Sequence, residues 1–225
     1  MIKYISKFIN SVPILIGFSI VFFFFQDQAL HFSEKYFGSK DIKEFYIFAF
    51  FVIYTLLCFL VAPAITNKIV YRESLKEMGL VFPEKKILSL VLIILSLIIL
   101  VPCIIYFAKL SAFQGYSLAH LSTHKFIFAI TFLFPLFYIG EEFFFRGFLF
   151  LGLWKRVGWH SFWITDIIFT LSHFGKPWLE VLMCIPASVV FNVLTLCTRS
   201  IFPAVVVHSL LGIILSILVT FNLVF

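Results

Sequence analysis

The chain has 225 residues, of which 62% are hydrophobic and only 12% carry a charge. Soluble domains carry about 25% charged residues, so this composition excludes an ordinary soluble domain and predicts a protein that folds in a lipid bilayer. The formal net charge is +6. No basic cluster with interleaved aromatic residues lies outside the apolar stretches, which argues against nucleic-acid binding.

Continuous apolar runs predict an all-α fold, because a helix that crosses a bilayer needs about 20 mostly apolar residues. We expect a single domain over 1–225, a polytopic transmembrane helix bundle of about seven spans, with a range of six to eight. The expected spans are 8–26, 45–66, 87–108, 126–153, 159–174, 178–197 and 201–224. Pro177 separates the fifth span from the sixth, since proline begins a helix more readily than it continues one.

Lysine and arginine residues predict the orientation, because they gather in cytoplasmic loops. With the N-terminus inside, the outer loops hold Lys35, Lys40, Lys43, Lys109, Lys125 and Lys176. The larger inner group is Lys3, Lys7, Lys68, Arg72, Lys76, Lys85, Lys86, Lys155, Arg156 and Arg199. We therefore expect an integral membrane protein with a cytoplasmic N-terminus, in the cytoplasmic (inner) membrane of a bacterium.

The fourth span carries three ionisable residues, Glu141, Glu142 and Arg146. A charged residue at the centre of a span costs about 2.5 to 3.5 kcal/mol, so pairing or function is needed to retain it. Glu142 and Arg146 are four residues apart and lie above one another on a helix face, where they can pair. Glu141 points about 100° away and is a candidate general base. The alternative is a buried ion network that only fixes helix packing.

Two histidines, His173 and His208, fall in later apolar spans. Each could simply bond to a neighbouring carbonyl group, but their position after the Glu-rich span indicates that they converge on one polar pocket.

These residues form a recognisable order of motifs. EExxxR is Glu141, Glu142 and Arg146, FxxxH is Phe169 and His173, and a third histidine, His208, follows on a later helix. The order resembles the CPBP family of intramembrane endopeptidases, the CAAX-protease and bacteriocin-processing enzymes, which include the eukaryotic prenyl-protein protease. The resemblance covers 125–225 as a CPBP-like catalytic core, whereas the N-terminal spans, 1–110, agree only in being transmembrane.

The resemblance implies an endopeptidase in which Glu141 and His173 activate a water molecule and His208 helps to stabilise the oxyanion. Phe169, Glu142 and Arg146 would support them. The third motif of the family is usually a histidine followed four residues later by asparagine, and this chain has Gly212 there. A second donor could then come from Asn192 or Ser209.

A metal-free, glutamate-type enzyme without a cofactor is favoured, since no HExxH is present. If the site instead holds zinc, its ligands would be Glu141, His173 and His208, because a catalytic zinc needs about three protein ligands and a water.

The expected substrate is a membrane-embedded or membrane-proximal peptide or protein. Prenylated tails are the substrates of the eukaryotic relatives, whereas a prokaryotic chain would cut a peptide precursor, a sorting tail or another membrane protein. One alternative function is a weak or inactive family member that acts as a bacteriocin-immunity or interaction protein, which the Gly212 departure favours. A small ion or proton-coupled transporter ranks third, because no internal repeat is visible.

Overall fold

The computed structural model describes Gly17, Ile20 and residues 43–223, and every regular element in that part of the chain is helical. The α-helices are α2 (Lys43–Leu56), α3 (Ala62–Thr66), α4 (Lys86–Ala108), α5 (Thr123–Phe128), α6 (Phe134–Glu142), α7 (Gly152–Val157), α8 (His160–Leu171), α9 (Trp178–Thr198) and α10 (Phe202–Thr220). The π-helical turns are η1 (Leu57–Val61), η2 (Asn67–Tyr71), η4 (Ala129–Leu133) and η5 (Phe143–Leu151), and η3 (Ser111–Tyr116) is a 3-10 helix.

Five helical stretches are long and apolar enough to cross a membrane. They are Phe45–Tyr71, Lys86–Ala108, Thr123–Val157, Trp178–Thr198 and Phe202–Thr220. The all-helical, membrane-spanning class is thus confirmed, and five of the expected spans coincide with these helices. The expected first span, 8–26, lies outside the described residues except for Gly17 and Ile20.

The expected fifth span, 159–174, is not among these five stretches. Its helix, α8, has 12 residues and is roughly 18 Å long at about 1.5 Å per residue, too short to cross a hydrocarbon core of about 30 Å alone. The chain then turns back, and α9 begins directly after Pro177, as expected. In the turn that follows α8, the His173 side chain is buried, whereas Phe174 and Lys176 are exposed.

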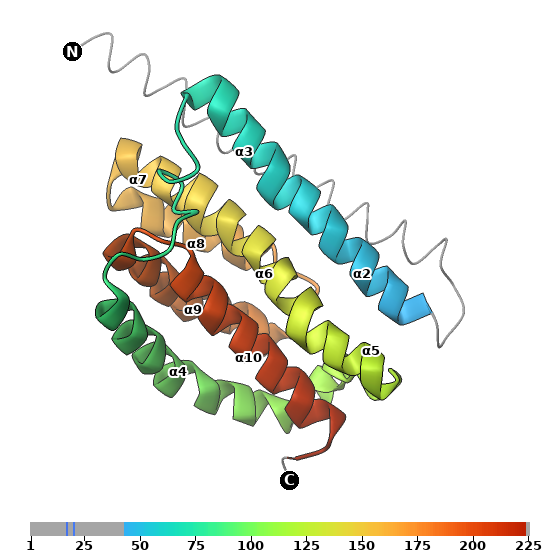
Figure 1. Ribbon diagram of the computed structural model, residues 1–225. Helices are drawn as coiled ribbons and strands as arrows, with labels where there is room; N and C mark the ends of the chain where they lie inside the picture. Colours follow the sequence, from blue (N-terminus) through green and yellow to red (C-terminus); the bar gives the residue numbers. More distant parts are fainter. Residues whose placement is uncertain (1–16, 18–19, 21–42, 224–225) are drawn as a thin grey trace, which may run out of the picture.

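The helices pack around α10 and the long helix that runs from α5 through α7. In Figure 1, α10 (red) runs beside α6 (yellow), and it packs against α4, α6 and α9. α2 packs against α6 on the other side, and α8 packs against α9. The stretch that carries Glu141 is therefore enclosed by helices from both halves of the chain.

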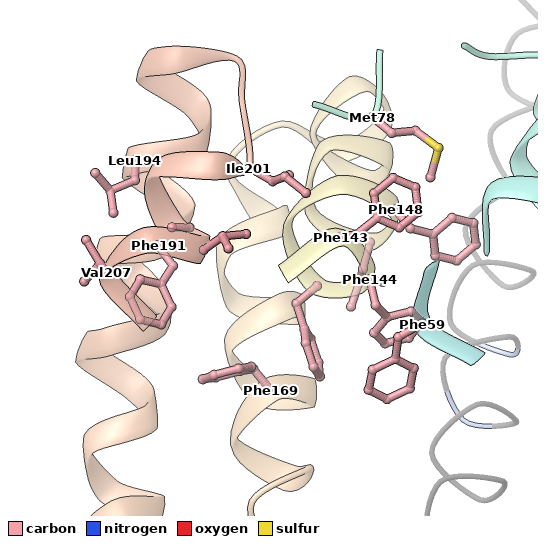
Figure 2. Packing of buried hydrophobic residues seen from close by; sticks show 14 of the residues in the cluster. Phe59, Met78, Phe143, Phe144, Phe148, Phe169, Phe191, Leu194, Ile201 and Val207 are labelled. Carbon is pink, nitrogen blue, oxygen red and sulfur yellow. The ribbon is translucent and has the colours of Figure 1, made fainter. Parts of the chain in front are cut away.

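Phenylalanine fills the core next to this stretch. Phe143, Phe144 and Phe148 on η5 are almost completely buried, and Phe144 stacks on Phe59 of η1 with ring centroids 4.5 Å apart. Figure 2 shows these rings gathered between Met78 and Phe59. Such dense aromatic packing holds the backbone after Glu142 in one position, because close-packed interiors transmit strain and tolerate little movement.

The loop between η2 and α4 is tied to η5 and to the start of α10. A Cβ on Gly147 would lie 2.5 Å from the Met78 carbonyl oxygen, so this close approach requires glycine. The Ile201 N–H donates to the Gly79 carbonyl at 3.0 Å, and Lys155 pairs with Glu73 at 3.0 Å. Loops that were expected on the inner side therefore meet at one end of the bundle.

Candidate active site

A cavity of about 350 Å³ lies in the half of the bundle away from the end at which Lys155 pairs with Glu73. Glu141 of α6, His173 of the α8–α9 turn and His208 of α10 all line it. Aromatic and aliphatic side chains form most of its wall, among them Phe48, Phe51, Phe107, Phe113, Phe134, Phe137, Leu211 and Leu215. A few polar groups thus lie in a mostly apolar cavity, the usual composition of a small-molecule or peptide site.

Glu142 and Arg146 form the ion pair that their spacing predicts. The Arg146 Nε donates to Glu142 Oε2 at 3.0 Å, and both side chains are completely buried. A pair this deep is held by further bonds, because desolvation of two charges costs several kcal/mol per ion. The other carboxylate oxygen of Glu142, Oε1, accepts from Nδ1 of His208 at 2.7 Å.

Arg146 also joins α8 and α9 to the pair. Its Nη1 donates to Ser188 Oγ at 3.1 Å and to the Asn192 amide oxygen at 3.3 Å. Asp166 of α8 accepts from the same two residues, at 2.6 Å from Ser188 and 2.9 Å from Asn192. Four helical segments are thereby bonded through one buried network.

Two expected donors are not brought to the cavity. Asn192 is fully buried and does not line the cavity. Its amide oxygen accepts from Arg146, and its amide nitrogen donates to Asp166. Ser209 is also buried and away from the cavity wall, and its hydroxyl has no hydrogen-bond partner in the described part of the chain. Neither residue lies where it could supply the second donor expected for an oxyanion, so Asn192 serves the Arg146 network instead.

Glu141 differs from its neighbour Glu142. Glu141 is buried, with a relative exposure of 7%. It nevertheless makes no hydrogen bond or ion pair to any residue within 43–223. A buried carboxylate without a partner is costly, which is a feature of a functional group. Its oxygens are left available to whatever enters the cavity.

His173 is held by the backbone of α8. Its Nδ1 lies 2.9 Å from the Phe169 carbonyl oxygen and 3.0 Å from Ser172 Oγ. Since a carbonyl only accepts, Nδ1 carries the proton and Nε2 keeps its lone pair. Burial lowers the pKa of His173 well below its ordinary value, and the Lys176 charge lowers it further. The ring is therefore neutral, with an acceptor nitrogen free for the cavity.

Phe169 packs among the polar groups. Its ring centroid is 4.6 Å from that of His173 and 6.1 Å from that of His208, and the Arg146 guanidinium lies 4.5 Å from it. It separates the buried cation from the cavity, which preserves a low-dielectric surrounding for both histidines.

The same cavity holds polar residues that sequence reasoning missed. Lys176 pairs with Glu180 at 3.0 Å, Tyr116 donates to Glu180, and Tyr138 lines the wall beside His208. Burial, followed by the Glu180 charge, raises the pKa of Tyr116, which keeps its hydroxyl protonated.

Two sequence signals could have pointed to some of these residues. Asp166 is the single acidic residue of α8. Tyr138 stands three residues before Glu141, so it shares a helix face with it.

Glu141, His173 and His208 were the expected ligands if zinc is bound. Within residues 43–223, no three His, Cys, Asp or Glu side chains are grouped closely enough to hold a metal ion. The residues present do not fit a zinc site, and the chemistry below uses the side chains alone.

The comparisons with known proteins agree with these motifs. Residues 123–214 match the family of type II CAAX prenyl endopeptidase Rce1-like proteins. Searches of the curated proteins and of the solved structures returned no match. The matched segment contains every residue of the three motifs and all of the Arg146 network. Residues 123–214 of this integral membrane protein are therefore similar to the type II CAAX prenyl endopeptidases, which supports the resemblance to the CPBP family of intramembrane endopeptidases.

Proposed function

We propose that the chain hydrolyses a peptide bond in a membrane-embedded or membrane-proximal substrate, as a glutamate-type endopeptidase. The observation that carries this proposal is the buried, unpaired Glu141 carboxylate, which lines one cavity together with His173 and His208. A carboxylate with free lone pairs and a neutral histidine are the groups needed to orient and deprotonate a water molecule.

Water activation is divided between two side chains. The His173 Nε2 accepts a hydrogen bond from the water, because the Phe169 carbonyl holds the proton of this ring on Nδ1. Glu141 takes the other water proton as the oxygen bonds to the carbonyl carbon of the substrate. The same proton then passes to the amide nitrogen when the carbon–nitrogen bond breaks, which regenerates the carboxylate.

Glu142 is a positioning residue in this mechanism. One of its oxygens pairs with Arg146 at 3.0 Å, and the other accepts from Nδ1 of His208 at 2.7 Å. The ring of His208 is thus aimed from α10 toward the cavity. Removing Arg146 would release both groups, so the ion pair supports the site without touching the substrate.

The cavity favours an apolar peptide segment. Eight phenylalanine residues line its wall, a composition typical of apolar binding sites: Phe48, Phe51, Phe107, Phe113, Phe134, Phe137, Phe169 and Phe191. The site lies in the half of the bundle opposite the basic loops, so with a cytoplasmic N-terminus it faces the non-cytoplasmic half of the bilayer.

A second candidate function rests on Gly212. Because the family motif carries asparagine there, a chain that lacks it could have kept the fold as an inactive interaction protein. That candidate requires neither Glu141 nor His173, so the same experiment separates the two functions.

The experiment compares protein termini in membranes by mass spectrometry. Cells would express the wild type, Glu141→Gln or His173→Ala, with Glu84→Gln and His124→Ala as matched exposed controls. We expect termini that require the wild type to persist in the controls and fall about 10²- to 10⁴-fold in the two site variants, the contribution of general acid–base catalysis. Identical termini with Glu141→Gln would overturn the protease function and leave the interaction protein.

A further inference from the structure

Tyr138 and Gly212 form a matched pair across the cavity. A Cβ on Gly212 would collide with the Tyr138 hydroxyl oxygen, and it would lie only 3.0 Å from two carbons of the ring. The phenol therefore occupies the space into which any side chain at 212 would project. Gly212 is one turn beyond His208 on α10, so the hydroxyl lies against the same face as that histidine.

Tyr138 is also fixed relative to Glu141. The two residues are three positions apart on α6, hence neighbours on one helix face, and both line the cavity. The Tyr138 ring lies 4.2 Å from the His208 ring between centroids. Its hydroxyl makes no hydrogen bond to any described residue, so its proton is available to a ligand.

The site needs such a donor. The Nδ1–H of His208 donates a hydrogen bond to Glu142, and a neutral imidazole has only that one N–H. Its Nε2 could donate to an oxyanion only if the ring carried both protons. A tyrosine hydroxyl, in contrast, donates while neutral over the whole physiological pH range.

We propose that Tyr138 is a catalytic residue whose hydroxyl donates a hydrogen bond to the developing oxyanion, with Gly212 providing the space for it. This inference rests on the proposed endopeptidase activity and names one further group for it. The donor moves no covalent bond; it stabilises the negative oxygen formed when water adds to the carbonyl. The hydroxyl thereby takes the position of a side chain that this chain lacks at 212.

The test uses the purified full-length protein in liposomes, with an internally quenched peptide that spans a cleavage site found by the termini comparison. Tyr138→Phe keeps the ring and removes only the hydroxyl. We expect kcat to fall about 10²- to 10³-fold, as for loss of one oxyanion donor, with KM nearly unchanged. Tyr106→Phe, at an exposed tyrosine, is the matched control and should leave kcat unchanged.

A rescue experiment guards against a structural effect. Tyr138→Ala should lower kcat to a similar degree, and adding Gly212→Asn should recover at least about tenfold, because an amide donor then enters the vacated space. Gly212→Asn alone should be inactive, since its Cβ meets the tyrosine. Full kcat in Tyr138→Phe, or loss only through KM, would overturn the proposal. If Tyr138→Phe is fully active and Glu141→Gln is inactive in the same assay, the role of Tyr138 is refuted but the endopeptidase function stands. An inactive wild type would refute both proposals.

Discussion

Replacement of Arg146 by methionine tests the network that positions the site. The change keeps an unbranched side chain of similar length but removes the charge that Glu142, Ser188 and Asn192 contact. Glu142 would remain completely buried with His208 as its remaining partner. Removing one member of a buried pair costs about 3 to 5 kcal/mol, because it leaves an uncompensated charge.

The cost can be measured as thermal unfolding of the purified protein in detergent. A change of 1 kcal/mol shifts Tm by about 2 to 4 °C for chains of 150 to 250 residues. Arg146→Met should therefore lower Tm by about 6 to 20 °C. Arg72→Met, at an exposed arginine, is the matched control and should shift Tm by no more than about 2 °C.

The double variant Glu142→Gln with Arg146→Met decides whether charge is the cause. It removes both charges, so it should be more stable than Arg146→Met alone, by at least about 2 kcal/mol. If the double variant is as unstable as the single one, lost packing and not an unpaired carboxylate explains the defect. The reasoning about the buried pair would then be refuted.

Three further outcomes follow from the structure. Gly147→Ala should lower the free energy of unfolding by about 1 to 3 kcal/mol, because its Cβ would meet the Met78 carbonyl oxygen at 2.5 Å. Gly115→Ala, with open space around it, is the control, and equal Tm values for the two variants would contradict the close approach. Chelators should leave peptide cleavage unchanged, since the described His and Glu side chains form no metal-binding group; inactivation that zinc reverses would contradict this. Lys109→Cys and Lys85→Cys, each in a cysteine-free background, test the expected cytoplasmic N-terminus. An impermeant maleimide should label Lys109→Cys in intact cells and Lys85→Cys only after permeabilisation, and the opposite pattern would reverse the orientation.

Local rules account for much of the fold. A hydropathy pattern reports whether a helix can be placed in lipid, and it identified five stretches that are apolar helices here. The Glu142–Arg146 pair was predictable because residues four apart are neighbours on any helix, and the two join at 3.0 Å. The α8 segment was harder, because its 12-residue helix and the following turn have no distinct hydropathy signature.

The sequence alone determined the solvent, the helical class and the order of the polar motifs, since these depend on composition and on spacing within one helix. Only the tertiary structure decided which groups meet between helices: that Glu142 holds His208, that Asn192 belongs to the Arg146 network, and that Tyr138 fills the space over Gly212. Periodicity gives the face of a helix but not its rotation and depth against another helix. Those are set by packing of the whole bundle, and they leave Glu141 unpaired at the cavity.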